Sequence, residues 1–565
     1  MLKSNLVCEN LSYFVDDKNL FSNLSLSLGN EKTGLVGSNG VGKTTLLKLI
    51  IGELVPKSGV VNLNCKVGYM PQNFVINENQ TIAEIFGIDQ KIRALEKINS
   101  GLGNQQDFDV VGDDWNAVEK VKDCLQKCNL NNLDLSRQVK TLSGGQVTRL
   151  FFARLLSDKS DFLILDEPTN NLDAESRLAL CEVIKNFDGG ILVVSHDREL
   201  LSLMDQIMEL SPLGLKTYGG NYADYVEQKR IEQETLGQDL IDAQKDLNKA
   251  RKTVQLSKER YDKRTKMGNK VRHQGGQPKV FLDFKKGRAE VTKSKLEKQT
   301  DKQLEDMKDK LIVAKSKLEQ KELLDFELEA TRVHNTKLVL EISDLVFVYY
   351  IDQTDPSAWS SPVVRPERNE LLASGVERVR TENKDLIISN FNMTLVGPKR
   401  IAISGKNGSG KTTLLKLIMG ELTPTSGSIK VGVQYCVYLD QNLSILDPNQ
   451  TIFENFKRLN PDVKETDCRL RLAAFLFAHD DALKLVCNLS GGERMRAALA
   501  CVLMGDTPPQ LILLDEPTNN MDLESIASIE RVFKNYKGAL IVISHDATFL
   551  QNIGVDEKIE LLKLR

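Results

Sequence analysis

The sequence predicts an α/β protein made of two copies of one unit, with an α-helical hairpin between them. The segment GSNGVGKTTLLKLIIGEL near the start returns as GKNGSGKTTLLKLIMGEL in the second half. Further along, LSGGQ returns as LSGGE, and LILDEPTNNLD returns as LILLDEPTNNMD, in the same order. A long stretch rich in Lys, Glu and Gln separates the two copies. These observations indicate an internal duplication around a linker.

The spacing of the repeated segments supports the duplication. Glu167 precedes His196 by 29 residues (196−167), and Glu516 precedes His545 by 29 residues (545−516). Equal spacing across such a length indicates that each copy keeps the whole unit. We expect a first repeat at 1–222, a linker at 223–336 and a second repeat at 337–565.

The first repeat carries additional residues. Gln72 and Ser143 are 71 residues apart (143−72), whereas Gln441 and Ser490 are 49 apart (490−441), a difference of about 22. These residues predict either a short arm at about 85–135 or a longer helical subdomain. The second repeat has a polar, proline-containing segment at about 351–384, which we expect to form an exposed insertion loop.

The linker pattern predicts two long antiparallel helices. Apolar residues alternate at spacings of three and four on either side of the interruption GNKVRHQGGQPK, which is typical of paired helices. They are Leu240, Ala243, Leu247, Ala250 and Val254, then Leu304, Met307, Leu311, Ala314 and Leu318.

Composition excludes several classes of protein. The chain has 565 residues, 41% hydrophobic and 27% charged, without a run of roughly 20 apolar residues that could span a membrane. The N-terminus lacks the apolar core of a signal peptide, so we expect a cytoplasmic protein. Nine cysteines are scattered without a CxxC pair, which favours reduced thiols over a metal site or a disulfide framework.

Both glycine-rich segments fit the pattern GxxxxGK[ST]. Glycines let backbone N–H groups turn towards phosphates, and the helix that follows presents its positive N-terminus. A lone match can be an ordinary glycine turn, but two in register, each after an apolar strand, predict two nucleotide sites. The predicted ATP-binding residues are Gly37, Ser38, Asn39, Gly40, Val41, Gly42, Lys43, Thr44 and Thr45, and Gly405, Lys406, Asn407, Gly408, Ser409, Gly410, Lys411, Thr412 and Thr413.

Within these loops the lysines and threonines have separate expected roles. Lys43 and Lys411 should reach the β and γ phosphates, whereas Thr44 and Thr412 should bind Mg²⁺. The runs FLILDEP and LILLDEP are typical of buried parallel strands. Their aspartates, Asp166 and Asp515, are therefore expected beside the metal. The predicted cofactors are ATP and Mg²⁺.

Two further residues in each repeat have catalytic chemistry. Glu167 and Glu516 follow the aspartates immediately and are candidate general bases for attacking water. His196 and His545 follow apolar strands in VVSHD and VISHD, where a neutral imidazole could bond a γ-phosphate oxygen. Core packing is the alternative for a histidine, but matched positions for two of only five histidines favour a role at the site.

The segments LSGGQ and LSGGE, ahead of the DEPT strands, resemble the signature of ABC ATPases. The resemblance implies that each ATP lies between the P-loop of one cassette and the signature of the other. The predicted signature residues are Ser143, Gly144, Gly145, Ser490, Gly491 and Gly492, so that Lys43 would act with Ser490 and Lys411 with Ser143. It also implies a monomer whose two cassettes pair with each other.

The same resemblance assigns several other residues. Gln72 and Gln441 look like the glutamines near Mg²⁺ and water, and Asp173 and Asp522 look like D-loop residues at the cassette interface. Tyr349 occupies the place of the adenine-stacking aromatic in the second repeat. Val15 aligns there in the first repeat, so that Tyr13 or Phe14 would have to substitute.

Tandem cassettes without a membrane domain, and YGGNYADYVEQK leading into a charged linker, resemble the ABC-F family. Such proteins are translation-associated ATPases that bind the ribosomal E site, where the linker approaches P-site tRNA and the peptidyl transferase centre. The resemblance implies the ribosome, through rRNA and P-site tRNA, as the partner. It leaves open ordinary elongation, rescue of stalled ribosomes and displacement of an antibiotic.

Charge gives a separate indication of RNA binding. Residues 251–300 contain 16 Lys or Arg and 5 Asp or Glu, a net of +11, whereas the whole chain is −3. A solvated helix face is the alternative, and the family resemblance favours RNA. The arm, if present, would also touch ribosome components. The expected contacts are Lys270, Arg272, Lys279, Lys285, Lys286 and Arg288.

Other ATPase classes fit less well. A tandem-cassette subunit that energises a separate membrane transporter is the main alternative, although it would not need a basic hairpin of this length. An iron-sulfur recycling ATPase would need clustered N-terminal cysteines. A DNA-repair or structural-maintenance ATPase usually divides one cassette around a far longer coiled coil.

Overall fold

A computed structural model gives the structure of the chain. It describes residues 5–15, 18–72, 79–131, 133–170, 172–273, 305, 307–308, 328–350, 384–519 and 521–562. The chain divides into two compact units. One unit holds Met1–Tyr222 together with Leu323–Arg565, and the other holds Ala223–Glu322. In the described residues, no helix has both the length and the apolar character needed to cross a membrane.

The first repeat contains two sheets. The antiparallel sheet has the order β2-β1-β4, and the larger sheet has the order β5-β6-β7-β3-β8-β9, in which only the β8–β9 pair is antiparallel. The strands are β1 (Leu6–Val15), β2 (Lys18–Leu28), β3 (Lys32–Val36), β4 (Ser58–Leu63), β5 (Val67–Met70), β6 (Phe162–Asp166), β7 (Gly190–Val194), β8 (Gln206–Ser211) and β9 (Gly214–Gly219).

Eight helices of the first repeat are described. They are α1 (Lys43–Ile50), α2 (Ile82–Ile85), α3 (Asp89–Asn99), α4 (Gln105–Val111), α5 (Ala117–Lys127), α6 (Gly144–Ser157), α7 (Ala174–Lys185) and α8 (Arg198–Leu201). The additional residues of this repeat include α3 and α4. Asn104 caps α4 through its side chain, which accepts a hydrogen bond from the Asp107 backbone N–H. Whether this segment acts as an arm stays a prediction.

The second repeat has the same two-sheet plan. Its antiparallel sheet has the order β11-β10-β13, and its parallel sheet the order β14-β15-β16-β12-β17. The strands are β10 (Leu338–Tyr350), β11 (Lys384–Val396), β12 (Arg400–Ser404), β13 (Ser426–Val431), β14 (Cys436–Leu439), β15 (Leu511–Asp515), β16 (Ala539–Ile543) and β17 (Glu557–Glu560). The helices are α11 (Lys411–Met419), α12 (Ile452–Leu459), α13 (Glu465–Ala474), α14 (Gly491–Leu503), α15 (Leu523–Asn535) and α16 (Ala547–Asn552).

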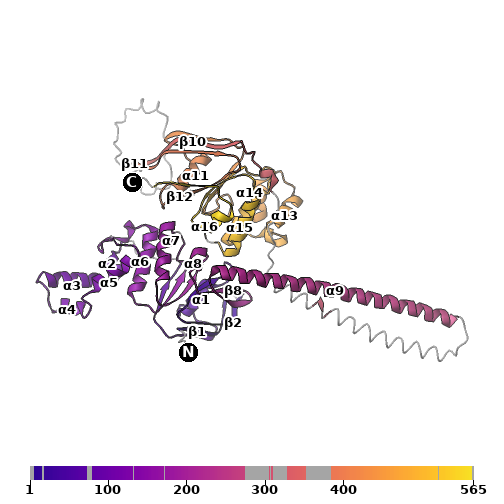
Figure 1. Ribbon diagram of the computed structural model, residues 1–565, viewed down its shortest axis with the longest axis horizontal. Helices are drawn as coiled ribbons and strands as arrows, with labels where there is room; N and C mark the ends of the chain where they lie inside the picture. The colour runs from indigo at the N-terminus through magenta and orange to yellow at the C-terminus, as the bar shows by residue number, and fades with distance from the viewer. Residues whose placement is uncertain are drawn as a thin grey trace. The chain divides into compact units, whose positions relative to one another are not determined.

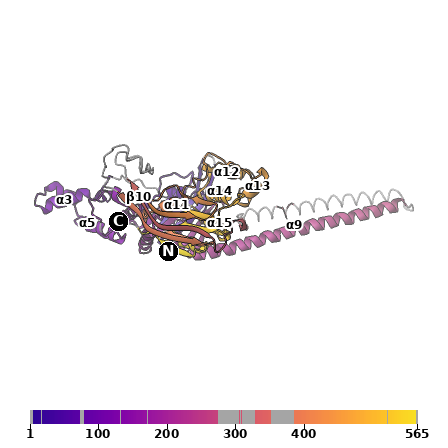
Figure 2. The ribbon, with the colours of Figure 1, turned by 90° about the horizontal axis from the view of Figure 1, so that it is seen from above.

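In each repeat the helix after the P-loop is buried between the two sheets. In the second repeat α11 lies beside β10 in both views, and Leu414, Leu415 and Leu417 belong to the same apolar cluster as residues of β10 and β15 (Figures 1 and 2). In the first repeat α1 contributes Leu46, Leu47, Leu49 and Ile50 to the corresponding cluster. Burial on both sides fixes the start of each helix relative to the parallel strands.

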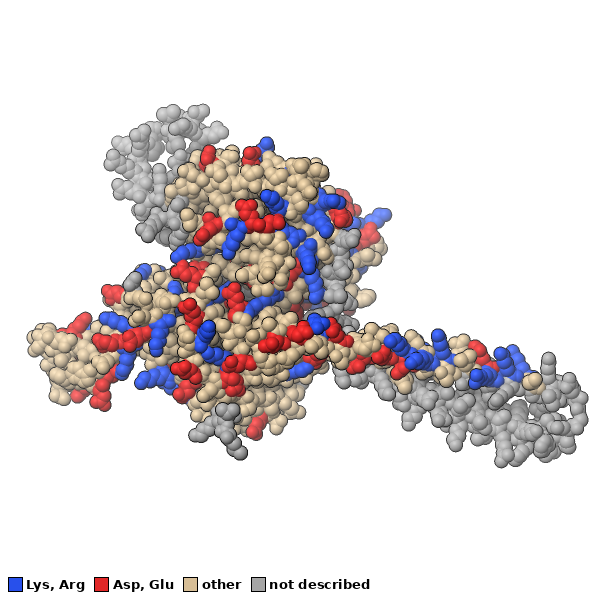
Figure 3. All heavy atoms as spheres, in the orientation of Figure 1, with Lys and Arg blue, Asp and Glu red and all other residues tan. Residues whose placement is uncertain are grey.

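The linker begins with α9 (Tyr222–His273), drawn as one unbroken helix in Figure 1. Its charge changes along its length: residues 222–244 have 6 acidic and 2 basic side chains, and residues 245–273 have 3 acidic and 11 basic ones. Figure 3 shows Lys and Arg side chains along the described part of this second segment. The predicted second helix lies outside the described residues apart from 305, 307 and 308. The predicted insertion at 351–384 also lies outside them except for Lys384, which begins β11.

Candidate active site

Glycines shape the loop before each P-loop helix. Gly37 has φ 153° and Gly405 has φ 148°, values that side chains rarely adopt. A Cβ atom on Gly37 would lie 2.3 Å from the Leu210 carbonyl oxygen, and one on Gly405 would lie 2.4 Å from the Leu561 carbonyl oxygen. The loop backbone therefore passes so close to the backbone of β8 in the first repeat, and to the residue after β17 in the second, that only glycine fits at these positions.

The two P-loop lysines have the same partners in their own loops. Lys43 donates to the carbonyl oxygens of Gly37, at 2.6 Å, and Ser38, at 3.2 Å. Lys411 makes the matching bonds to Gly405 and Lys406, at 2.8 and 3.2 Å. Burial lowers the pKa of both amines, and nearby carboxylates partly offset it. Each loop thus holds its ammonium group within the curve of backbone where a phosphate is expected.

The predicted threonine and aspartate meet at both sites. Thr44 Oγ1 donates to Asp166 Oδ2 at 2.8 Å, and Thr412 Oγ1 donates to Asp515 Oδ2 at 2.7 Å. Each aspartate ends a fully buried parallel strand, as predicted. Burial raises the pKa of both carboxyl groups. In the second repeat Tyr438 also donates to Asp515 Oδ2, at 3.2 Å.

One carboxylate oxygen at the first site fits a metal ligand. Asp166 Oδ1 is buried and has no hydrogen-bond partner among the described residues. Buried acceptors without partners are costly, and a hard cation such as Mg²⁺ prefers oxygen ligands of this kind. The donor set of Thr44 and Asp166 therefore fits Mg²⁺ bound together with a nucleotide.

The residue after each aspartate has a strained backbone. Glu167 has φ 48° and Glu516 has φ 47°, in the left-handed region that costs a residue other than glycine about 1 to 3 kcal/mol. The backbone N–H of Glu167 donates to Val194 O at 2.8 Å, and that of Glu516 donates to Ile543 O at 2.9 Å. These bonds hold the chain in its turn, which directs both side chains away from the strand direction.

The glutamates lie beside the predicted histidines. Glu167 Oε1 is 3.4 Å from His196 Nε2, and Glu516 Oε1 is 3.3 Å from His545 Nε2. Burial raises the pKa of Glu167 to about 8 and that of Glu516 to about 7. Burial also lowers the pKa of His196 to about 3 and that of His545 to about 4. The imidazoles are therefore neutral at neutral pH, so each contact joins two polar groups and is not an ion pair.

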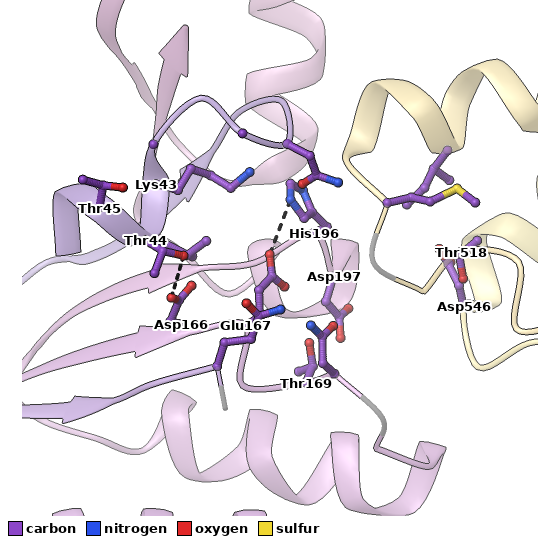
Figure 4. A pocket seen from close by; sticks show the side chains of 18 of the residues that line it. Lys43, Thr44, Thr45, Asp166, Glu167, Thr169, His196, Asp197, Thr518 and Asp546 are labelled. Carbon is purple, nitrogen blue, oxygen red and sulfur yellow. Dashed lines mark hydrogen bonds and ion pairs between the residues drawn. The ribbon is translucent and has the colours of Figure 1, made fainter. Parts of the chain in front are cut away.

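A cavity of about 800 Å³ joins these groups in the first repeat to residues of the second. The first repeat supplies the P-loop, Gln72, Asp166, Glu167 and His196, and the second repeat supplies Thr518, Met521, Ile526 and Asp546. Figure 4 shows Thr518 and Asp546 facing the cavity from across the side chains of the first repeat. Residues from both repeats thus line one cavity.

The D-loop aspartates join each repeat to the other. Asp522 Oδ2 accepts a hydrogen bond at 3.0 Å from the backbone N–H of Asn39, 483 residues away in the chain. Asp173 accepts the corresponding bond from the backbone of Asn407. Each P-loop is therefore held in part by the D-loop of the other repeat.

The signature residues, unlike the D-loop aspartates, are described only by contacts within their own repeats. Ser143 and Ser490 begin α6 and α14 as N-caps, and their side chains accept hydrogen bonds from Gln146 and Glu493 backbone N–H groups. The signature serines and glycines are not among the residues that line the cavity of the first repeat. Their predicted pairing with the P-loop of the other repeat stays a prediction.

The candidate adenine-stacking residues of the first repeat do not all line the cavity. Val15 and Leu20 line the cavity, but Tyr13 and Phe14 do not. The Tyr13 ring lies 6.4 Å from that of Phe21, and Lys57 Nζ lies 4.3 Å from the centre of the Phe14 ring. The side chain of Tyr349 lies outside the described part of the structure, as do the side chains of all six predicted RNA contacts.

Several lining residues were not predicted from the sequence. Thr169 and Asn170 lie in the repeated segment DEPTN, and Asp197 follows the repeated histidine, so their positions in the repeats could have indicated them. Arg177 carried no such signal, because the related position in the second repeat is Ile526.

The comparisons with known proteins place this fold and site in a family. The family model described as "ABC transporter" matches residues 21–170 and 388–519. The chain is 30% identical over 563 residues to a protein of Bacillus subtilis (strain 168) named as the ATP-binding protein YdiF, covering 95% of this chain and 76% of that protein. It is 28% identical to "ABC transporter F family member 5" of Arabidopsis thaliana, covering 93% of this chain and 70% of that protein. The chain belongs to the ABC-F family of ATP-binding cassette proteins.

Another relative matches the protein along almost its whole length. The "Uncharacterized ABC transporter ATP-binding protein YfmM" of Bacillus subtilis (strain 168) is 28% identical, covering 98% of this chain and 97% of that protein. The predicted fold class and the predicted ATPase activity are confirmed by this membership. The ABC-F protein is thus an ATPase with two cassettes, which are the two repeats.

The raised pKa values predict a pH-dependent stability. With folded values of about 8 and 7 against an ordinary 4.5, the two glutamates stay protonated in the folded protein while they ionise in the unfolded chain. The two groups therefore add to the free energy of unfolding below pH 4.5, and this addition is lost as the pH rises through their pKa values in the folded protein. The loss is at most about 1.4 kcal/mol per unit of pKa difference for each group. We expect the urea concentration at the midpoint of unfolding of the nucleotide-free protein to be lower at pH 8 than at pH 5. The decrease should be larger than the one measured for Glu167→Gln/Glu516→Gln. Parallel pH profiles of the urea midpoint for the two proteins would contradict this prediction. Glu96→Gln, a change at an exposed glutamate in α3, serves as the control and should keep the pH profile of the parent protein.

Proposed function

We propose that this ABC-F ATPase is a ribosome-associated factor whose ATP-driven closure of the two cassettes permits binding at the ribosomal E site. In this position the linker influences P-site tRNA and the peptidyl transferase centre, and hydrolysis releases the protein. The role is a conformational timer for translation, rescue of stalled ribosomes or protection against an antibiotic. The single observation that carries the proposal is the basic linker between the two cassettes of an ABC-F protein.

The ATP sites support a cycle of closure and reopening. Residues of both cassettes line the cavity beside Lys43, and each P-loop donates a backbone hydrogen bond to the other cassette, to Asp522 or to Asp173. A nucleotide that contacts both cassettes stabilises the closed arrangement by its binding free energy. Cleavage of the γ-phosphate removes part of that stabilisation.

The hydrolytic step assigns separate roles to the residues at the first site. Lys43 and the loop N–H groups neutralise the phosphates, and His196 orients a γ-phosphate oxygen. Glu167, in the ionised form that exists beside the protonated one near its pKa of about 8, positions the attacking water and accepts its proton, with Asp166 and Thr44 holding the metal. Mg²⁺, when bound, supplies positive charge that offsets the charge of the phosphates. Lys411, Thr412, Asp515, Glu516 and His545 act in the same way at the second site, and Gln72 and Gln441 lie near the metal and water.

The linker supports the choice of an RNA partner. The 11 basic and 3 acidic residues at 245–273 give the second part of α9 a net charge of +8 (11−3), while its first part, residues 222–244, is acidic. Basic side chains on a nucleic acid gain affinity by releasing counterions from phosphates. Such contacts fix position without reading base sequence.

Removing both general bases should hold the protein on ribosomes. The Glu167→Gln/Glu516→Gln variant binds ATP without hydrolysing it, so the closed state persists. We expect it to co-sediment with purified ribosomes in ATP and not in ADP. Lys43→Ala/Lys411→Ala, which removes both P-loop ammonium groups, is the control and should stay in the supernatant. Absence of co-sedimentation with ATP demonstrably bound would refute the ribosomal proposal and favour a membrane partner.

Charge at the linker tip should control the salt dependence of binding. Replacing Lys270, Arg272, Lys279, Lys285, Lys286 and Arg288 with Gln in the same hydrolysis-deficient protein should weaken ribosome binding. It should also reduce the slope of log affinity against log salt concentration. The slope should fall by about 0.7 to 0.9 for each phosphate that the tip no longer neutralises. ATP binding at the P-loops should not change.

A control with the same loss of charge uses exposed residues of the two cassettes. For this control we expect an unchanged slope of log affinity against log salt. If the control set and the tip set reduce ribosome binding equally, the basic tip is only a solvated helix face. The control set is Lys140, Lys159, Lys430, Lys464, Arg531 and Lys534.

A further inference from the structure

Arg177 of the first cassette lies between the two ATP sites. It is on α7, four residues after the D-loop Asp173, and its side chain is only 14% exposed. Arg177 Nε is 3.2 Å from Asp197 Oδ2, and Arg177 Nη1 donates to the carbonyl oxygen of His545 at 2.9 Å. One guanidinium group therefore contacts the residue after the histidine of the first site and the histidine of the second.

The contacts of Arg177 complete a continuous chain between the two glutamates. At one end Glu167 touches His196, whose neighbour Asp197 pairs with Arg177. At the other end Arg177 holds His545, which touches Glu516. Each step is 3.4 Å or less or is a peptide bond. These side chains are at most 14% exposed, so water screens the interactions weakly.

Asp197 is a firm anchor for this chain. Its side chain is 6% exposed, and Oδ1 accepts hydrogen bonds from the backbone N–H groups of Glu199 and Leu200 at the start of α8. Because one carboxylate oxygen is fixed by the helix start, the other holds Arg177 in one direction. A shift of the His196 segment would therefore move the guanidinium and, through it, the backbone at His545.

The related position in the second cassette has no such group. Alignment on Asp173 and Asp522 places Ile526 opposite Arg177, and an isoleucine cannot pair with Asp546 or donate to His196. The positive charge of Arg177 also lowers the pKa of His545 and of Glu516, each as a smaller effect than burial. The second site therefore receives a cation from the first cassette, whereas the related position of the second cassette, Ile526, offers the first site none.

A neighbouring ion pair is equally one-sided but lies off this chain. Arg198 Nη1 is 2.6 Å from Glu530 Oε1 across the cassettes, and both side chains are largely buried. The related residues are Ala547 and Cys181, which cannot form an ion pair. This pair fastens the same interface without touching either histidine, so it offers a matched control.

We propose that Arg177 is a positioning residue that couples the two ATP sites by linking the His196–Asp197 segment of the first to His545 of the second. The inference rests on the proposed roles of Glu167 and Glu516. Blocking hydrolysis at one site changes the position of the histidine at the other through Arg177. The two sites then work as a pair, and the cassettes reopen only after both have reacted.

Turnover of single-base variants tests this coupling. In the parent protein, Glu167→Gln and Glu516→Gln should each retain about a tenth of the parent's ATP turnover. Independent sites would retain about half, so the expected turnover is about fivefold lower than that. This factor is at the low end of ordinary coupling between sites. In the Arg177→Ile background, which copies Ile526, each should retain about half of the turnover of Arg177→Ile itself. Equal fractional losses with and without Arg177, or retention of half in the parent, would overturn the proposal.

Two controls separate coupling from other effects. Arg198→Ala/Glu530→Cys, which copies the related pair, loosens the same interface and should keep the parent's fractional losses. The same loss of coupling in that variant would mean that general weakening of the interface explains Arg177→Ile. Arg177→Met replaces Arg177→Ile if the latter folds poorly, as judged by binding of a fluorescent ATP analogue. Full turnover in Glu167→Gln/Glu516→Gln would instead refute the assigned general bases, which is a separate failure.

Discussion

The parallel alignment of β3, β6 and β7 is the constraint on which the first ATP site depends. Parallel strands end at a common edge, so the loop after β3, the Asp166–Glu167 pair at the end of β6 and the Ser195–His196 pair after β7 meet there. The second cassette repeats this with β12, β15 and β16. Burial at that edge then sets the chemistry, because it raises the pKa values of the glutamates and keeps the histidines neutral.

Duplication gave two similar sites, but the contacts between them have diverged. The P-loop lysines, the Thr–Asp bonds and the strained glutamates agree in detail, with φ values of 48° and 47° for Glu167 and Glu516. The interface between the cassettes does not. Arg177 and Arg198 face the second cassette, where their counterparts are Ile526 and Ala547. A single polypeptide permits this asymmetry, whereas two identical subunits would have to present the same residues twice.

The sequence predicted the parts of the site that recur locally. Both P-loops, the strand-end aspartates and glutamates, and the histidines follow from short patterns beside apolar strands. Their meeting at one edge follows from strand order. The roles of Arg177 and Glu530 depend on how two distant surfaces meet, which no local pattern encodes. Alignment placed Val15 at the expected adenine position, but that Val15 and Leu20 line the cavity required the structure.

The most direct test of the account is a structure of Glu167→Gln/Glu516→Gln bound to ATP and Mg²⁺. The account predicts two ATP molecules in each chain, one between Lys43 and Ser490 and the other between Lys411 and Ser143. It also predicts that Asp522 and Asp173 keep their bonds to the opposite P-loops. ATP held by the P-loops alone, with both signature serines remote from the γ-phosphates, would contradict shared sites and with them the closure that the proposed function requires.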